Sequence, residues 1–387
     1  MDELPASGDV REDFDVVVVG GGIVGLCVTW FLAREGVGVI CLDSGAPGGS
    51  TANAGSLHVQ MQSRLMRLFP ERIPDYVKTL PMYPRAVEFW AEIAAEVDED
   101  IDFSQGGGLM IAENRAQFEA LGVKVERERK QGIDSVLVDR PRLLGMAPYL
   151  DSAVYGAAWC RQEGKLNPLA ANRAVLERAV VCGAVVRTSE RVVGVEKRHA
   201  GLTVRSRRGE YRCGRVVIAA GAGTGALTGP LGCDVPVTAE PLHMSITEAA
   251  EPLVAGLLQH AESPITLKQF GNGQLVIGGG WPAKLCAGRR APAVKLSSIR
   301  GNLRLASRLL PAIRNLRVIR AWAGINPTVD LLSVVGELPT CKGVFVAVPG
   351  DAGYTLGPYC ARLVVDAMQG RPPDFPLTDF APGRPAG

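Results

Sequence analysis

Residues 15–25 read DVVVVGGGIVG, and this stretch decides how the first part of the chain folds. The four valines at 16–19 favour a buried strand, and the glycine-rich turn after them leads into residues 26–34, which have the composition of a buried helix. A second apolar run, residues 37–42, then stops at Asp43. We therefore expect a βαβ unit whose two strands are parallel.

The glycine spacing inside this unit is Gly20-x-Gly22-x-x-Gly25. In this position Gly20 permits a tight turn, Gly22 lets the backbone approach a pyrophosphate, and Gly25 lets the helix pack closely on the strand. Asp43 is then placed to accept hydrogen bonds from ribose hydroxyls. The unit predicts a dinucleotide site, although a glycine turn in another kind of α/β protein is the alternative. Nicotinamide and flavin dinucleotides use the same motif, so this unit does not choose between them.

Composition limits the other possibilities. The 387 residues are 47% hydrophobic, which suits two or three globular domains. A formal net charge of +2 argues against a nucleic-acid partner. The first 15 residues lack the pattern of a signal peptide, and no apolar run approaches the length of a membrane span, so we expect a cytoplasmic protein without membrane insertion. The nine cysteines contain no Cys-x-x-Cys pair, so we expect no metal site and no iron–sulfur cluster in this chain.

Hydrophobic periodicity predicts further elements along the chain. Helical spacing marks residues 84–97, 169–181, 295–309 and 358–368. Buried strands are expected at 184–187, 215–219, 318–322 and 344–348. The alternating segments 267–270 and 274–277 predict antiparallel strands in a second, sheet-rich domain.

Motifs beyond the βαβ unit resemble the amino-acid-oxidising flavoprotein superfamily, which includes glycine oxidase, sarcosine oxidase and D-amino-acid dehydrogenases. The resemblance covers nearly the whole chain in the expected order, and it implies FAD as the cofactor. It is carried by residues 53–55 (NAG), 164–168 (GKLNP), 216–223 (VVIAAGAG), 322–328 (WAGINPT) with Gly336, and 353–358 (GYTLGP).

A narrower resemblance is to the FAD-carrying B or β subunit of opine oxidases and hydroxyproline dehydrogenases. Residues 54–60 (AGSLHVQ), 278–282 (GGGWP) and the GYTLGP turn carry it. It implies a hetero-oligomer with a larger α subunit and a small iron–sulfur subunit, so that FMN and an iron–sulfur cluster would belong to the partners. We find no motif for covalent attachment and expect non-covalent FAD.

The superfamily resemblance implies an α/β fold with a discontinuous FAD-binding, Rossmann-like domain and an antiparallel-sheet substrate domain. We assign residues 14–75, 150–225 and 326–380 to the FAD-binding domain, 76–149 and 226–325 to the substrate domain, and 1–13 and 381–387 to tails. The motifs together imply a set of FAD-binding positions, namely Gly20, Gly22, Ile23, Gly25, Asp43, Ser44, Ser50, Thr51, Asn53, Ala54, Gly55, Val192, Ala220, Gly221, Gly353, Tyr354, Thr355 and Leu356.

The implied reaction is hydride transfer from the carbon beside an amine to flavin N5, with an opine of the octopine or nopaline kind or a D-hydroxyproline-type imino acid as substrate. His58 is a candidate for polarising the flavin or contacting substrate, with a structural histidine as the alternative. Tyr354 is a candidate substrate contact or a packing aromatic. Lys268 and Arg64 are candidates for a carboxylate clamp, with exposed cations as the alternative.

Two departures affect the substrate. Relatives such as glycine oxidase have an arginine where this chain has Asn326, and often a Gly-His pair where it has Val348 and Pro349. A bulkier substrate or a different carboxylate clamp is therefore expected. The competing functions are a stand-alone glycine, sarcosine or D-amino-acid oxidase, a non-catalytic subunit that only holds a flavin, and, least favoured, a nicotinamide-dependent dehydrogenase.

Overall fold

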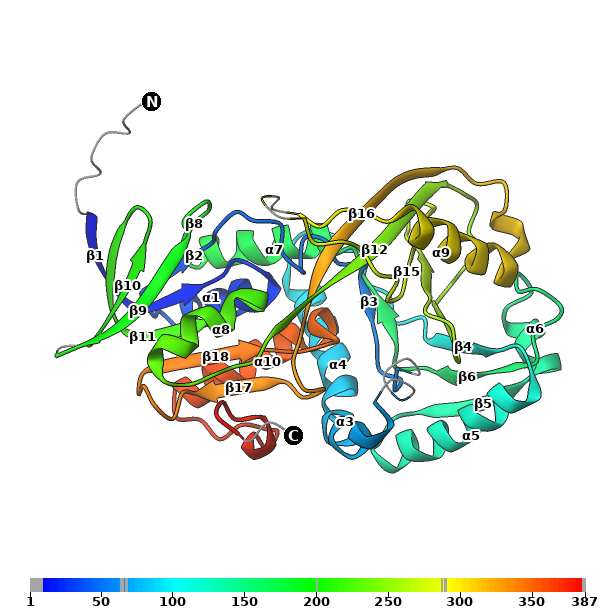
Figure 1. Ribbon diagram of the computed structural model, residues 1–387, viewed down its shortest axis with the longest axis horizontal. Coiled ribbons are helices and arrows are strands. Elements are labelled where there is room, and N and C mark those ends of the chain that lie inside the picture. The colour runs from blue at the N-terminus through cyan, green and yellow to red at the C-terminus, as the bar shows by residue number, and fades with distance from the viewer. Residues whose placement is uncertain are drawn as a thin grey trace.

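The computed structural model describes residues 10–62, 66, 69–199, 201–286, 288 and 291–384. Its strands form two large sheets, and Figure 1 shows the first sheet at the left and the second at the right. The first sheet has the order β17-β18-β11-β1-β2-β8, and β10 and β9 extend it beside β11. Its strands are β1 Val10–Val19, β2 Val39–Leu42, β8 Val185–Arg187, β9 Val192–Arg198, β10 Gly201–Ser206, β11 Gly209–Ile218, β17 Val334–Glu337 and β18 Val344–Val348.

Strand β1 forms the expected βαβ unit. It pairs in parallel with β2, from Val16 opposite Val39 to Val19 opposite Leu42, and in parallel with β11 on its other side. The connecting helix α1 is buried along all of its eleven residues, because the sheet and other helices surround it. The helices around it are α4 Met82–Glu96, α7 Pro168–Val181 and α10 Gly353–Met368, while α1 itself is Ile23–Ala33.

Helix α10 contains Pro358 in its second turn. Proline has no amide hydrogen, so the carbonyl of Tyr354, four residues earlier, loses its helical partner. The indole nitrogen of Trp90 on α4 donates to that carbonyl at 3.0 Å. The helix therefore starts at Gly353, earlier than the predicted residue 358, because a tertiary contact replaces the missing backbone hydrogen bond.

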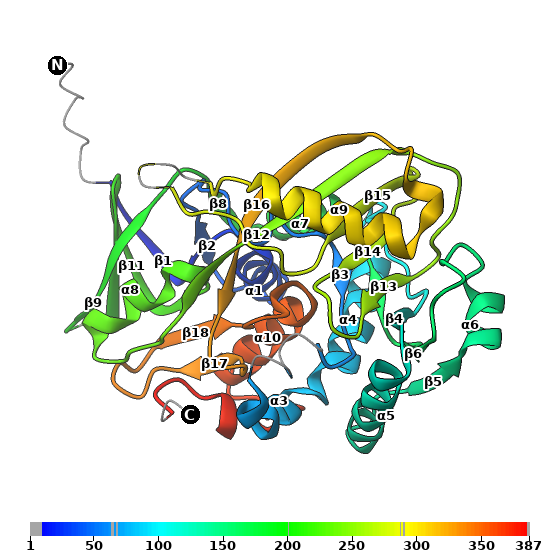
Figure 2. The same cartoon turned by 45° about the vertical axis from the view of Figure 1, so that its right-hand side comes forward.

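The second sheet has the order β16-β12-β15-β14-β13-β4-β6-β5. Its neighbours are antiparallel, as predicted, except for the parallel pair β13 and β4. Helix α9 lies across it in Figure 2, and Leu305 and Leu309 of α9 share a core with Leu258 and Leu267 of the sheet. Its strands are β4 Gly108–Ala112, β5 Ser135–Asp139, β6 Gly156–Cys160, β12 Thr238–Ala249, β13 Leu257–His260, β14 Thr266–Gln269, β15 Gln274–Gly278 and β16 Val318–Thr328.

The mixed α/β architecture is confirmed, but some elements were not predicted. Helix α5 escaped prediction because most of its surface is charged. Helix α9 Leu296–Leu309 corresponds to the predicted helix 295–309. The elements not predicted are the small pair β3 Ser56–Leu57 and β7 Gly164–Lys165, the helices α3 Ile73–Thr79, α5 Arg115–Lys130, α6 Arg140–Met146 and α8 Thr224–Thr228, and the 3₁₀ turns η1 Pro70–Arg72, η2 Gly221–Gly223, η3 Gly229–Leu231, η4 Pro311–Ile313 and η5 Thr378–Phe380.

Two elements lie outside the domain to which their sequence segment was assigned. Strand β6 falls in the segment 150–225 of the predicted FAD-binding domain, yet it pairs with β4 and β5 in the second sheet. Helix α4 falls in the predicted substrate segment 76–149, yet Phe89 and Trp90 pack in the core around α1 and α10. Local sequence patterns do not show which core an element joins. The division of the whole chain into domains remains a proposal.

Candidate functional site

The turn after β1 requires glycine at three positions. Gly20 has φ of +111°, and a Cβ atom there would lie 2.4 Å from the carbonyl oxygen of Ala219. A Cβ atom on Gly25 would lie 1.8 Å from the carbonyl oxygen of Gly20, and one on Gly22 would lie 2.9 Å from Ser50 Oγ. A larger residue at position 20 or 25 would therefore displace backbone, and one at position 22 would displace the Ser50 side chain.

The start of α1 has the properties of an anion site. Its first residue follows Gly22, which provides no side-chain hydrogen bond, and no acidic residue lies in the first turn. Ser50 Oγ accepts a hydrogen bond from the Ile23 amide at 2.9 Å, which fixes residue 50 beside the helix start. The positive end of α1 therefore fits the pyrophosphate of a dinucleotide, as the sequence predicts.

Asp43 lies at the end of β2, next to the glycine turn. Its carboxylate accepts hydrogen bonds from the amides of Gly21 at 3.3 Å and Gly45 at 3.2 Å. Its own carbonyl accepts from the Glu190 amide at 2.6 Å, which brings the segment before Val192 to the same place. This is the position in which a carboxylate would meet a ribose, so Asp43 and Val192 remain proposed contacts of the adenosine half.

The loop after Asp43 closes against the second sheet. Asn53 Oδ1 accepts from the Gly55 amide at 2.7 Å, and a Cβ atom on Gly55 would lie 2.0 Å from the carbonyl oxygen of Leu166. The indole nitrogen of Trp322 on β16 donates to the carbonyl of Ala52 at 2.9 Å. Other side chains hold the loop to itself, since Ser44 Oγ accepts from the Ala46 amide and Thr51 Oγ1 donates to the Gly48 carbonyl.

The start of α10 meets the end of the same loop. Thr355 Oγ1 accepts from the His58 amide at 3.0 Å, while Leu356 is buried. Added Cβ atoms at Gly221 and Gly353 would meet nothing within 4 Å, so both backbones border open space. The predicted FAD positions in residues 20–25, 43–55, 220–221 and 353–356 thus belong to segments that fold around one another, with Ala54 between Asn53 and Gly55. Which of them touch FAD stays a prediction.

Tyr354 is directed away from these segments. Its ring stacks on Trp90 with the centroids 5.3 Å apart, and its hydroxyl hydrogen-bonds to the Pro168 carbonyl at 3.0 Å and to Asn172 Oδ1 at 3.1 Å. The side chain is therefore committed to the core. These contacts fit the alternative of a packing aromatic, and a contact of Tyr354 with substrate stays a prediction.

Lys268 is fully buried on β14, so the alternative of an exposed cation does not hold. Its ammonium donates to Ser56 Oγ at 2.6 Å, and no carboxylate among the described residues lies within 4 Å of it. Burial, and then the charge of Lys165, lowers its pKa to about 7. A buried ammonium without a counter-ion is costly unless a ligand supplies the anion.

His58 lies one residue beyond β3, and its side chain is 17% exposed. Its Nδ1 atom is buried without a hydrogen-bond partner and lies 3.9 Å from a carboxylate oxygen of Glu163. Burial, and then the charge of Lys268, lowers the pKa of His58 to about 3, so the ring is neutral near pH 7. A neutral imidazole offers a hydrogen-bond acceptor to a ligand.

Glu163 is the centre of a buried polar network that the sequence did not reveal. Its carboxylate accepts hydrogen bonds from the amides of Val59 and Gln60 and from the side chains of Gln60 and Gln259. Burial raises the pKa of Glu163 above its ordinary value. No local pattern marks this residue, because its partners lie about a hundred positions away in the chain.

A buried ion pair extends the network. Lys124 and Glu128 on α5 are 2.7 Å apart, and neither side chain is exposed to solvent. Lys124 also donates to Gln60 Oε1 at 2.8 Å, while Glu128 accepts from the Met61 amide at 2.6 Å. The segment after His58 is therefore held by charged side chains from a helix that packs on the second sheet.

Two other sequence predictions concern the side chains that would bind the substrate carboxylate, the carboxylate clamp. Arg64 lies outside the described residues. Asn326 Nδ2 donates to Asp351 Oδ1 at 2.9 Å, so an amide and an acid meet where relatives were expected to carry an arginine. Lys124 is paired with Glu128, so the other buried cations that the described residues bring to the site are Lys268 and its neighbour Lys165.

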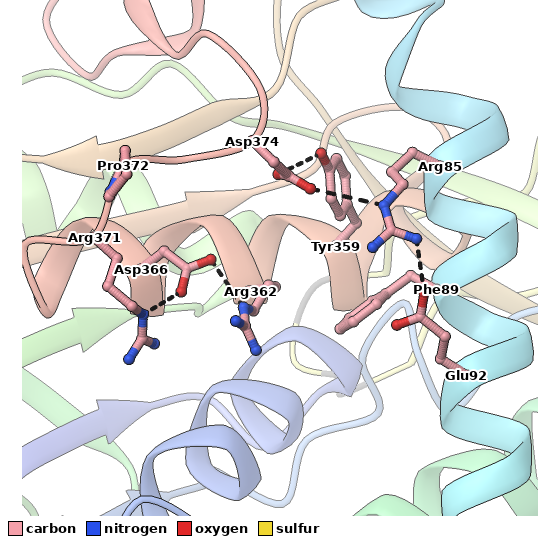
Figure 3. A pocket seen from close by; sticks show the side chains of 9 residues that line it. All are labelled: Arg85, Phe89, Glu92, Tyr359, Arg362, Asp366, Arg371, Pro372 and Asp374. Atoms are coloured by element: carbon pink, nitrogen blue, oxygen red, sulfur yellow. Dashed lines mark hydrogen bonds and ion pairs between the residues drawn. The ribbon is translucent and has the colours of Figure 1, made fainter.

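A separate groove of about 400 Å³ lies between α4, α10 and the C-terminal segment. Figure 3 shows that its charges are paired, with Arg85 contacting Glu92 and Asp374, and Asp366 lying between Arg362 and Arg371. None of the predicted site residues is among those that line it. The groove is distinct from the candidate site.

Two other features are absent from the residues that the structure describes. In that part of the chain, no group of three or more His, Cys, Asp or Glu side chains is arranged to hold a metal ion. In the same residues, no helix is both long and apolar enough to cross a membrane.

A glycine turn at a helix start, a parallel βαβ unit and a second sheet facing the same loop define a dinucleotide-binding α/β protein of two-sheet architecture. The chain belongs to the DAO family, described as FAD dependent oxidoreductase, whose model matches residues 15–367. FAD is therefore the cofactor, and the enzyme is an oxidoreductase. The glycine turn and the uncapped start of α1 fit that cofactor.

Similar proteins extend over almost the whole chain. Glycine oxidase of Bacillus subtilis is 25% identical over 94% of this chain and 95% of its own length. A subunit of the opine oxidase of Rhizobium meliloti is 26% identical over 91% and 92%. The crystal structure of glycine oxidase from Geobacillus kaustophilus superposes with a TM-score of 0.83 at 23% identity, covering 97% of this chain and all of that one. The superfamily resemblance predicted from the motifs is confirmed.

Proposed function

We propose that this FAD-dependent oxidoreductase oxidises a carboxylated secondary amine, either an opine of the octopine or nopaline kind or a D-hydroxyproline-type imino acid. The carbon that bears the amine would lose a hydride, for which FAD supplies the acceptor atom N5 when it is bound. The proposal rests above all on Lys268, a buried ammonium whose described hydrogen-bond partner is the neutral Ser56. A substrate carboxylate would provide the missing counter-ion.

The chain's own residues would position the substrate rather than carry out covalent chemistry. Lys268 would hold a carboxylate against the face of the second sheet that meets β3. His58 is neutral near pH 7, and it would accept a hydrogen bond from the amine, which must be unprotonated for hydride loss. Burial between the two sheets would keep water from the reacting carbon.

We further propose that the chain acts as one subunit of a cytoplasmic hetero-oligomer, with a larger α subunit and a small iron–sulfur subunit that receive the electrons. The similarity to a protein that is itself named as one subunit of an opine oxidase supports this assembly. FMN and the iron–sulfur cluster would then be bound by the partners.

A stand-alone amino-acid oxidase is the second candidate function, and the similarity to glycine oxidase favours it. Such an enzyme would be active without partners and would produce hydrogen peroxide. A subunit that only holds flavin is the third candidate. It would keep an oxidised flavin in the presence of every amine tested.

The test is anaerobic reduction of the purified holoprotein together with whatever co-purifies. Octopine, nopaline, cis-4-hydroxy-D-proline, glycine and sarcosine are added separately, and the flavin absorbance is followed. Bleaching by an opine or by hydroxyproline supports the proposal. Bleaching by glycine or sarcosine alone supports the oxidase, and an unchanged spectrum with all five substrates contradicts both.

A further inference from the structure

Lys165, a second buried lysine, lies beside Lys268 and has no role in the proposed reaction so far. It is 8% exposed on β7, and its ammonium donates to the main-chain carbonyl of Gln269. Residue 165 pairs directly with Ser56 across the small β3–β7 ladder. Side chains of directly opposed residues project from the same face of a ladder, so Lys165, Ser56 and Lys268 form one contiguous cluster.

The cluster has an excess of positive charge. Among the described residues, no carboxylate lies within 4 Å of either ammonium. The nearby acid Asp102 is engaged with the Gly271 amide at 2.9 Å. Burial lowers the pKa of Lys165, which the charge of Asp102 opposes, and the charge of Lys165 in turn lowers the pKa of Lys268. Both lysines would be fully protonated only beside compensating negative charge, so the cluster favours a ligand that carries more than one negative charge.

We infer that Lys268 and Lys165 form a double cation site that selects substrates with two carboxylates, one on each side of the secondary amine. This inference rests on the proposed function and specifies its substrate class. Such a substrate would offer one carboxylate to each lysine, on either side of the amine. Ser56, whose Oγ already accepts from Lys268, would orient that lysine between its two partners.

Reduced flavin is the other source from which the anion could come, because its ring system also carries negative charge. The two sources predict different behaviour of the two lysines. If the anion is the flavin, replacing Lys165 would change the binding of every ligand by the same factor. If the anion is a second substrate carboxylate, replacing Lys165 would weaken the binding of dicarboxylates and leave the binding of monocarboxylates nearly unchanged.

Two matched ligand pairs separate these outcomes. Iminodiacetate and sarcosine differ by one carboxylate on the same N-substituted glycine, and both have the reactive amine. Diglycolate and methoxyacetate repeat this difference with an ether oxygen in place of the amine, so they cannot be oxidised. Their dissociation constants are measured by titrating the flavin absorbance of the holoprotein, which reports binding without turnover.

We expect wild-type protein to bind diglycolate at least about 30-fold more tightly than methoxyacetate, because a buried charged contact is gained. Lys165→Met should remove this preference and leave methoxyacetate binding within about threefold, whereas Lys268→Met should weaken both ligands. Lys165→Arg should retain part of the preference, and the flavin content of each variant shows whether it has folded.

Equal effects of Lys165→Met on diglycolate and methoxyacetate would overturn the inference and indicate a role towards the flavin. A wild-type protein that sarcosine bleaches faster than iminodiacetate would also overturn it, while leaving amine oxidation established. Absence of bleaching with both amines and with the opines would instead contradict the proposed function.

Discussion

The glycine turn at residues 20–25 and the polar network around Glu163 are both buried, yet they are built from opposite kinds of residues. In the turn, close packing depends on missing side chains, and the tightest approaches, at Gly20 and Gly25, are to backbone carbonyl oxygens. In the network, residues 59–61 are held by the Glu163 carboxylate, by side-chain amides and by a buried ion pair. The first region tolerates no added atoms, whereas the second tolerates no lost charges. Mutations of each kind should therefore test this contrast.

The largest effect is expected from Gly25→Ala. The new Cβ atom would lie 1.8 Å from the carbonyl oxygen of Gly20, which is backbone and cannot rotate away. We expect loss of bound FAD and destabilisation of roughly 3 kcal/mol or more, at the upper end of overpacking effects. The ratio of flavin to protein absorbance after purification measures this. Gly145→Ala is the control, because a Cβ atom there would meet nothing within 4 Å. A Gly25→Ala variant that purifies with its full content of bound FAD would contradict the prediction.

The next largest effect should come from Glu128→Gln, which removes one charge from the buried network. Lys124 would lose its counter-ion but keep its hydrogen bond to Gln60, so we expect a loss at the lower end for a broken buried pair, about 3 kcal/mol. Chemical denaturation should show this as a lower free energy of unfolding. Glu119→Gln breaks an exposed pair with Arg115 and should change stability by less than about 1 kcal/mol. Similar losses of unfolding free energy in both variants would show that the buried pair contributes no more to stability than the exposed pair.

A pH-dependent effect is expected from His58, and for each pH unit it is smaller than the two losses above. Its pKa is lowered to about 3 in the folded protein, whereas the unfolded chain takes up a proton near the ordinary value of 6.5. The free energy of unfolding should therefore fall as pH decreases from about 6.5 towards 3, by up to about 1.4 kcal/mol per pH unit. His58→Gln should reduce this slope, and His199→Gln, at an exposed position, should not. Identical slopes in wild type and His58→Gln would refute the assignment.

The smallest effect should come from Tyr354→Phe. The ring keeps its stacking on Trp90, while the hydrogen bonds of the hydroxyl to the Pro168 carbonyl and Asn172 are lost. We expect about 1 kcal/mol lower stability and an unchanged KM for the amine substrate. A large rise in KM with normal stability would return Tyr354 to the substrate site.

The same contrast explains what could be predicted from the sequence. The glycine turn was predictable because its spacing, the preceding valines and Asp43 are close together in the chain, and each has a direct physical reason. Helices 168–181 and 296–309 were predicted within a residue or two because their periodicity is local. The early start of α10 was missed, since it depends on a hydrogen bond from Trp90 that no local pattern contains.

In the candidate site, sequence could name Lys268 but could not tell that it is buried. Its partner Ser56 is 212 positions away, and the neighbouring charge comes from Lys165 on a third segment. Glu163 was missed for the same reason, since its partners Val59 and Gln60 lie 104 and 103 positions earlier. Contacts of this range follow from the packing of the two sheets and not from spacing along the chain.

The hydrogen bond from Trp322 to Ala52 has a consequence for biosynthesis. The loop of residues 45–55 leaves the ribosome early, but the strand that closes over it, β16, emerges some 270 residues later. Helix α10, which fixes the other end of the same loop through Thr355, is made later still. The segments proposed to bind FAD therefore come together only when the chain is nearly finished. If they do bind it, truncated chains should accumulate without cofactor.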